Sequence, residues 1–278
     1  MLTIFSIPKP FSGNIRIIQR NAIQSWLSLE PACEVILFGD EEGTAETAHE
    51  FGIRHVPDIS TNEYGTPLLS AAFECARETA EHDTLIYVNT DIIFMPDLVS
   101  AVRKINKPLF LMSGRRWDLD IIQELDFGDT SWRDTIREMV RAQGRLHGFS
   151  GIDYFVFPRR LSCALPSFAV GRPGWDNWFI YAVRTMKIPV IDASEAVTVV
   201  HQNHVSVYSP RDNESTQNFR MAGGFSRMMS LRDANLLMDR GGLKKPGGIR
   251  GIYSAMSGYS PIRELLALKR KINLMFVK

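Results

Sequence analysis

Short apolar runs alternate with stretches of helical periodicity over the first hundred residues of this 278-residue chain. Strand character is seen in residues 2–7, 33–38, 53–59 and 84–88. Apolar residues recur with the period of a helix that has one buried face in residues 14–29 and 44–51. Thr66 and Pro67 are expected to begin a third helix, because Pro fits the first helical turn and Thr can cap it. These repeated strand–helix–strand units predict an α/β fold with a mostly parallel central sheet and helices on both faces.

The second half of the chain is less regular, and it contains no clear linker or internal repeat. Further strands are expected at residues 110–114, 152–158 and 196–200, and further helices at 131–143 and 175–185. A basic, partly amphipathic segment covers residues 261–277. One domain with a more variable second half is the simplest organisation.

The fourth apolar run continues into the polar triplet Asn89-Thr90-Asp91 before apolar residues resume. Removing an unpaired carboxylate from water is costly, so Asp91 needs a cationic partner, a proton or a metal. Asp40 and Asp58 follow the second and third strands. Because ligands of such sheets bind beyond the carboxyl ends of the strands, the three acids indicate a binding rim. A helix cap or salt bridge for Asp91, and a solvated turn for Asp40, remain alternatives.

Charge is balanced over the whole chain but concentrated near its C-terminus. The 32 basic and 31 acidic residues give a net charge of +1, which names no class of partner. Between Arg240 and Lys278 there are nine basic residues and one acid, a local net charge of +8. We expect no nucleic-acid partner, because these residues form no recognisable module. A solvated terminus and contact with an anionic membrane stay open.

The three cysteines, Cys33, Cys75 and Cys163, lack metal-type spacing and are expected to be buried, reduced thiols of a cytoplasmic protein. No apolar run approaches the roughly 18 residues that a membrane span needs. The N-terminus reads as a first strand and not as a signal peptide.

Several nucleotide-binding motifs are missing from the expected places. The turn after the first strand is PKPFSG, which is not the glycine-rich turn of a dinucleotide-binding dehydrogenase. A phosphate-binding P-loop and the glycine-rich, arginine-containing opening of a sugar nucleotidyltransferase are also missing. With these motifs excluded, the sequence still predicts a sheet of the nucleotide-binding type with an acidic residue at the end of its fourth strand.

The stretch YVNTDIIF (87–94) resembles the Asp-X-Asp region of glycosyltransferases with the GT-A fold. Three further pieces follow in the expected order: GFSGIDYFVFPRRL (148–161), GRPGWDNWF (171–179) and VVHQNH (199–204). The resemblance covers roughly residues 2–205 and is to bacterial, family-2-like glycosyltransferases with a His-Gln-Asn-His segment. It implies a Rossmann-like nucleotide-diphospho-sugar transferase domain over residues 1–240. Residues 1–98 would be its nucleotide-binding half, residues 99–240 its acceptor half, and residues 241–278 a basic extension.

The resemblance also implies an activity. A hexosyl or N-acetylhexosaminyl group would pass, with inversion, from a nucleoside-diphosphate sugar to a saccharide or lipid-linked saccharide. This chemistry would serve cell-surface polysaccharide biosynthesis, in the cytoplasm or at the inner face of the membrane. A Mn²⁺ or Mg²⁺ ion would bridge the two phosphates and stabilise the leaving group. Asp91 would be one ligand and His201 or His204 another, while Asn89 replaces the first Asp of the usual motif and removes one charge.

Other roles follow from the resemblance with alternatives beside them. Contacts to the nucleotide-sugar are implied for Ser6, Ile7, Pro8, Asp40, Asp58, Asn89, Thr90, Asp91, Gly151, Asp153 and Trp175. Asp153 could instead pair with Arg159 or Arg160 as part of the structure. Residues 115–118 would line the acceptor side, or be an ordinary charged loop. The resemblance also allows Lys244 or Lys245 to reach the donor diphosphate, as a C-terminal lysine does in some relatives.

Asp176 is the expected general base, within about 3 Å of the acceptor oxygen. Trp175 and Trp178 would then lie against sugar faces. In the alternative, Asp176 caps a helix and both tryptophans belong to the core.

Two rival functions remain. A nucleotidyltransferase on the same sheet would release pyrophosphate from a nucleoside triphosphate. A catalytically inactive, nucleotide-sugar-binding scaffold would keep its biological role after Asp91→Ala.

Overall fold

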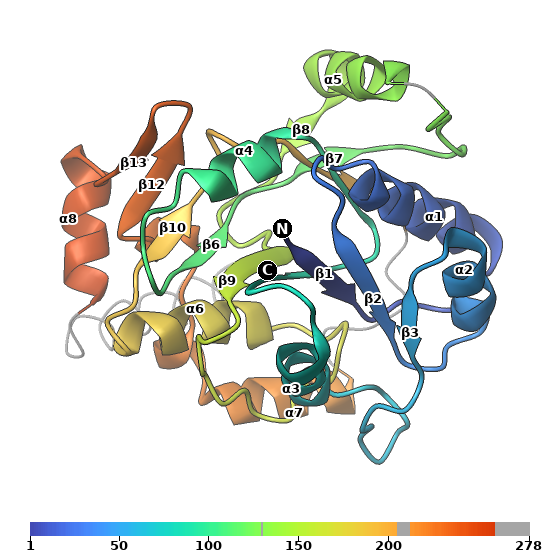
Figure 1. The fold of residues 1–278 in the computed structure, drawn as a ribbon. Coiled ribbons are helices and arrows are strands. Elements are labelled where there is room, and N and C mark those ends of the chain that lie inside the picture. The colour runs from blue at the N-terminus through green and yellow to red at the C-terminus, as the bar shows by residue number, and fades with distance from the viewer. Residues whose placement is uncertain (129, 205–211, 259–278) are drawn as a thin grey trace, which may run out of the picture.

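The computed structural model describes residues 1–128, 130–204 and 212–258, which form two sheets and their flanking helices (Figure 1). The larger sheet of these residues has the order β13 (Gly242–Lys244), β12 (Leu236–Asp239), β10 (Val190–Asp192), β6 (Leu111–Ser113), β9 (Tyr154–Pro158), β4 (Thr84–Val88), β1 (Thr3–Ser6), β2 (Glu34–Phe38) and β3 (Arg54–Val56). Strand β9 is antiparallel to β4 and β6, and β13 is antiparallel to β12. The other neighbours are parallel, so the predicted mostly parallel α/β sheet is confirmed.

Helices cover both faces of this sheet (Figure 1). One face packs against α1 (Gly13–Leu27), α2 (Thr44–Phe51) and α4 (Asp97–Arg103). The opposite face packs against α3 (Leu69–Thr79), α6 (Trp175–Thr185) and α7 (Asn213–Ala222). Because strand side chains alternate, Phe5 and Tyr87 belong to the α3 side, and Ile4 and Ile86 to the α1 side. These strands are buried on both faces, which explains their continuous apolar sequence.

The smaller sheet lies at the edge of the α1 side. It includes the strand that directly follows the polar triplet Asn89-Thr90-Asp91. Its order is β5 (Ile92–Phe94), β11 (Val199–Gln202), β7 (Trp117–Leu119) and β8 (Arg145–Leu146). Helix α5 (Ser131–Gln143) packs on it through Trp132 and Ile136. This sheet brings segments near residues 91, 118 and 201 side by side.

Most parallel strands end at one rim. Strands β4 and β6 run in the same direction, since both are antiparallel to β9 between them. Strands β1 and β2 run with β4, and β10 runs with β6. The residues that follow β1, β4, β6 and β10 therefore meet at the carboxyl rim of one sheet.

One detail of the sequence prediction needs correction. Helix α3 begins at Leu69, because Pro67 forms an isolated bridge with Thr61 and the side chain of Asn62 accepts a hydrogen bond from the Thr66 N–H. The domain boundary expected at residue 240 falls inside the β12–β13 hairpin.

The chain then continues into α8 (Gly248–Ser257), beyond the short 3₁₀ helices η1 (Phe225–Arg227) and η2 (Leu231–Asp233). Helix α8 is tied to η2 by a hydrogen bond from the Arg250 guanidinium to the Leu231 carbonyl. Strand β13 thus pairs within the larger sheet, and α8 contacts η2. The basic segment 261–277 lies outside the described residues.

Cys163 is buried, Cys33 and Cys75 are half-buried, and all three are free thiols. Within residues 1–128, 130–204 and 212–258, no helix has both the length and the apolar character required to cross a bilayer.

Candidate functional site

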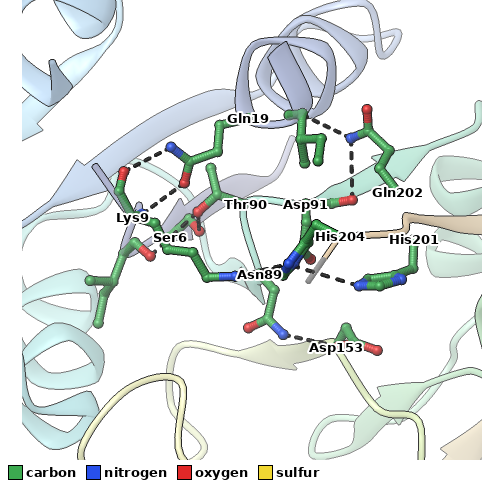
Figure 2. Close-up of polar contacts among 12 residues, drawn as sticks. Ser6, Lys9, Gln19, Asn89, Thr90, Asp91, Asp153, His201, Gln202 and His204 are labelled. Carbon is green, nitrogen blue, oxygen red and sulfur yellow. Dashed lines mark hydrogen bonds and ion pairs between the residues drawn. The ribbon is translucent and has the colours of Figure 1, made fainter. Parts of the chain in front are cut away.

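A cavity of about 550 Å³ opens at the carboxyl rim, between the ends of β1 and β4 and the smaller sheet. Its polar lining is drawn largely from predicted site residues (Figure 2). Eight predicted residues line it: Ile7, Pro8, Asn89, Thr90, Asp91, Asp153, His201 and His204. The structure therefore brings together segments that lie more than a hundred residues apart in the sequence.

Asp91 is fixed in the cavity floor through its backbone. Its carbonyl accepts hydrogen bonds from the backbone N–H of Gln202, at 3.1 Å, and from Nε2 of the same residue, at 3.2 Å. Gln202 is fully buried and also donates to the Ile18 carbonyl of α1 at 2.8 Å. The strand that carries His201 and the turn that carries Asp91 are thus held in one register.

Ser6 and Thr90 join the ends of β1 and β4 beneath the cavity. The Ser6 hydroxyl donates to the Val88 carbonyl at 2.5 Å and lies 2.8 Å from Oγ1 of Thr90. Ser6 is fully buried, so it supports the cavity floor without lining it.

Two imidazoles converge on the Asp91 carboxylate. His204 Nε2 lies 3.0 Å from Asp91 Oδ2, and His201 Nε2 lies 3.8 Å from the same oxygen. His201 faces Asp91 because β11 pairs with β5, which places His201 opposite Ile92. The remaining oxygen of Asp91, Oδ1, is buried and has no hydrogen-bond partner among the described residues.

These three side chains suit a divalent cation. One ligand atom from each of Asp91, His201 and His204 lies within 4.8 Å of the others. Ligand atoms around an octahedral cation stand roughly 3 to 4.3 Å apart, so small side-chain movements would complete the set. The orphaned Asp91 oxygen supports this use, because a buried carboxylate oxygen without a donor is otherwise costly.

The charge state of the cluster also suits a metal. Burial alone would raise the pKa of the Asp91 carboxyl, but the hydrogen bond with His204 and the positive charges of His201 and Lys9 hold that pKa well below its usual range. Burial lowers the pKa of His201, with the Asp91 carboxylate opposing the change. A carboxylate beside a neutral imidazole is the form that binds cations.

Lys9 was not predicted from the sequence and lies directly over this cluster. Its Nζ is 3.2 Å from His204 Nε2 and 3.8 Å from Asp91 Oδ2. The side chain of Gln19 holds its backbone, accepting from the Lys9 N–H at 2.7 Å and donating to the Lys9 carbonyl at 2.8 Å. The only hint in the sequence was a lysine in the turn after the first strand.

A second carboxylate supports His201 from behind. Strand β7 pairs with β11 so that Asp118 stands opposite His201, and their Oδ1 and Nδ1 atoms are 3.4 Å apart. Asp118 also accepts from Arg116 Nε at 3.0 Å and lies 2.9 Å from His147 Nδ1. His201 Nδ1 has no hydrogen-bond partner among the described residues, so Asp118 acts on this imidazole through its charge.

Asp153 forms the opposite wall of the cavity. Its Oδ2 accepts from Arg116 Nη1 at 2.6 Å, and its Oδ1 accepts from Asn89 Nδ2 at 2.9 Å. Arg159 and Arg160 bond backbone carbonyls elsewhere, so the alternative pairing of Asp153 with them is not seen. Arg116, expected on the acceptor side, lines the same cavity as Asp91.

Besides Ser6, four predicted contact residues do not line the cavity. Asp40 and Asp58 are exposed, and neither lines it. Gly151 is buried against His147, where a Cβ atom would come within 2.3 Å of the ring. Trp175 is 6% exposed and packs edge-on against Tyr87 at 5.0 Å, so it belongs to the core, as the alternative reading held. Lys244 pairs with Asp239 and Glu195 at the edge of the sheet.

Asp176 occupies the first turn of α6 and does not line the cavity. Burial raises the pKa of its carboxyl to about 6, with a contribution from the negative charge of Asp153 and opposition from backbone hydrogen bonds. Its role as a base stays a prediction.

Comparisons with known proteins give matches among solved structures alone. No protein-family model matches the chain, and no curated protein matches it. It is similar to a mannosyltransferase of Pyrobaculum calidifontis, solved with GDP-Man and Mn²⁺, at 14% identity and a TM-score of 0.46. The similar region covers 81% of this chain and 62% of the mannosyltransferase, so the chain spans less than two thirds of that protein.

Two further similar structures are a glucosyl-3-phosphoglycerate synthase and GalNAc-T7. The synthase, from Mycobacterium tuberculosis and solved with Mg²⁺ and UDP, is 14% identical, with a TM-score of 0.47 and coverage of 81% of this chain and 80% of the other. GalNAc-T7, solved with UDP, GalNAc and Mn²⁺, is 13% identical, with a TM-score of 0.48 and coverage of 80% and 48%. These likenesses say nothing of individual side chains.

The raised pKa of Asp176 predicts a pH-dependent stability difference. An aspartate with a pKa near 3.9 when unfolded and about 6 when folded destabilises the native state as pH rises between these values. Asp176→Asn removes this loss. We expect its free energy of unfolding, relative to the wild type, to increase by about 2 kcal/mol between pH 4 and pH 8 in urea titrations. Parallel pH profiles for the two proteins would show that Asp176 is not buried as described.

Proposed function

We propose that this chain is a metal-dependent glycosyltransferase with the GT-A fold. It transfers a sugar from a nucleoside-diphosphate sugar to a hydroxyl group of a saccharide or lipid-linked saccharide. The observation that carries the proposal is the cluster of Asp91, His201 and His204 in a 550 Å³ rim cavity, with one Asp91 oxygen unpartnered among the described residues.

Mn²⁺ or Mg²⁺ would be held by these three side chains, and when bound it would neutralise the departing diphosphate. Ser6, Thr90 and Gln202 form an ordered cavity floor, so the Asp91 carboxylate would not need to move when the cation binds. Such preorganised charge is what stabilises a leaving group in a site shielded from water.

Lys9 would complete the diphosphate site. In the structure its ammonium stands over the Asp91 carboxylate, where it supplies the positive charge that the buried acid needs. A divalent cation in the cluster would repel this ammonium toward the cavity, where the diphosphate would lie. Lys9 would then bind phosphate oxygens beside the metal.

Asn89 and Asp153 form the wall where the donor sugar would bind. Their mutual hydrogen bond at 2.9 Å leaves an amide and a carboxylate at the cavity surface, and both groups suit sugar hydroxyls. Transfer would proceed with inversion if Asp176 takes the acceptor proton. A pKa of about 6 suits a general base, which must be ionised at the working pH.

Helix α8 supports a peripheral contact with an anionic membrane. Ile249, Ile252 and Met256 lie on one helical face and are 87%, 62% and 43% exposed. Lys244 and Lys245 directly precede this helix, in the part of the chain with a local net charge of +8. Exposed apolar groups beside basic residues are the pattern of interfacial helices, and such a contact would suit an enzyme of cell-surface glycan synthesis at the cytoplasmic face.

Asp91→Asn should abolish Mn²⁺-dependent binding of nucleoside diphosphates, because the amide removes the anionic ligand. Calorimetric titration of UDP and GDP with and without Mn²⁺ measures this directly. Asp58→Asn is the matched control, since Asp58 is exposed and away from the cavity lining. Wild-type affinity in Asp91→Asn would reject the metal site.

The same titration discriminates the rival functions. Tighter binding of a nucleoside triphosphate than of nucleotide-sugars, with pyrophosphate release, would favour a nucleotidyltransferase. Donor binding without any turnover would favour a scaffold.

Lys9→Met should change metal and nucleotide binding in opposite directions. Loss of the competing ammonium should raise Mn²⁺ affinity by about 3- to 10-fold, while loss of a phosphate contact should weaken diphosphate binding by a similar factor. Electron paramagnetic resonance of free Mn²⁺ gives the first quantity and calorimetry the second. Weakened binding of both would instead make Lys9 a structural support of the cluster.

Ile249→Glu with Ile252→Glu should reduce cosedimentation with phosphatidylserine vesicles by about 10-fold or more, because two apolar side chains no longer enter the bilayer. Ile122→Glu is the control, since Ile122 is 77% exposed outside α8. Equal sedimentation of the double variant and the wild type would remove α8 from the membrane contact.

A further inference from the structure

Three arginines surround the ring of Phe149. The guanidinium carbons of Arg115, Arg232 and Arg250 lie 4.6, 5.2 and 5.2 Å from the ring centre. No two of these carbons can therefore be more than about 10.4 Å apart. The arginines come from three separate segments: the residues after β6, the 3₁₀ helix η2, and helix α8.

Positive charge in this group exceeds the negative charge that faces it. Asp192, 3% exposed, accepts from Arg250 at 2.5 Å, and its other oxygen is occupied by the N–H and hydroxyl of Ser194. In the described part of the chain, no side-chain acceptor bonds the guanidinium of Arg115 or Arg232. Arg115 Nε is buried and lacks a hydrogen-bond partner there. The cation–π contacts with Phe149 stabilise the three guanidinium groups, and an anion bound between them would reduce their mutual repulsion further.

The arginine cluster stands on the same rim as the proposed donor site. Arg115 follows the carboxyl end of β6, and Asp192 is the last residue of the neighbouring parallel strand β10. Both strands run with β4, and Asp91 follows the end of β4.

The chain links the two sites closely. Arg115 directly precedes Arg116, and Phe149 lies four residues before Asp153. Arg116 and Asp153 both line the donor cavity and are bonded to each other. The cluster is thus beside the cavity, toward β6 and β10, and away from the β1 side where the nucleotide would lie.

We propose that Arg115, Arg232 and Arg250 form a binding site for an anionic group, a phosphate or a carboxylate, on the acceptor substrate. This rests on the proposed function for its reference to an acceptor. Guanidinium groups bind both anions through paired, charge-assisted hydrogen bonds. Arg232 is exposed, Arg115 Nε has no hydrogen-bond partner among the described residues, and all three guanidinium carbons lie within 5.2 Å of the Phe149 ring centre.

Anion binding tests the proposal directly. Inorganic phosphate, glucose 6-phosphate, glucuronate and glucose are titrated calorimetrically into the wild type and into Arg232→Gln and Arg115→Gln. We expect the wild type to bind at least one of the anions and to bind glucose more weakly. Each substitution should weaken the preferred anion by about 10-fold or more. Preference for the sugar phosphate or for the uronate assigns the acceptor group.

Arg103→Gln is the matched control, because Arg103 is exposed at the last turn of α4, away from Phe149. Mn²⁺-dependent binding of UDP or GDP is measured on the same samples and should be unchanged in all three variants. Unchanged donor binding also shows that the variants are folded.

Two results would overturn the proposed anion site. The first is no binding of any anion by the wild type at an anion concentration of 10 mM, roughly the weak end of specific binding. The second is an equal loss of anion affinity in Arg103→Gln and Arg232→Gln. Either result could occur with metal-dependent nucleotide binding intact, which would leave the proposed function standing. Loss of that nucleotide binding in the wild type would reject the proposed function without deciding whether the arginines bind an anion.

Discussion

The Asp91 carboxylate is buried at the end of a central strand, and its need for positive charge organises the rim of the sheet. Lys9 supplies that charge, while His204 and His201 approach the same carboxylate oxygen, and all three groups lie within 3.8 Å of it. The other oxygen is left buried without a donor among the described residues. An unpartnered buried oxygen is costly in a purely structural contact, and a bound cation would give it a use.

The smaller sheet fixes the positions of the side chains around Asp91. Strand β11 lies between β5 and β7, so His201 faces Asp91 on one side and Asp118 on the other. Gln202, the next residue, bonds the Asp91 backbone and α1. The strand register therefore sets the distance between the Asp91 carboxylate and the His201 imidazole. Arg116 extends the network from Asp118 to Asp153 on the opposite wall of the cavity.

The parts of this arrangement that depend on local periodicity could be predicted from the sequence. The mostly parallel sheet followed from alternating strand and helix spacing, and helices α2 and α5 match their predicted bounds. Asp91 was identified by the cost of a charge in an apolar run. Lys9 was missed because its partner His204 lies 195 residues away in the sequence, and only the loop conformation brings the two side chains together. Trp175 was placed at the ligand because its sequence neighbours do not reveal which face of α6 is buried.

Helix α8 shows what composition alone does not reveal about the segment near the C-terminus. Its basic composition suggested a separate extension, yet Arg250 points inward to Asp192 and Phe149, while Ile249 and Ile252 are exposed. Composition records the charge of a segment but not which side chains turn toward the fold. The same short helix thus contributes to the rim and presents an apolar outer face.

The most direct test of the central claim is a crystal structure grown with Mn²⁺ and a nucleoside diphosphate, with anomalous diffraction to locate the ion. The account predicts an anomalous peak about 2.0–2.3 Å from an Asp91 oxygen and from at least one of the two histidine nitrogens, in contact with the diphosphate. A diphosphate bound in the cavity with no manganese at Asp91, and Lys9 still paired with its carboxylate, would contradict it.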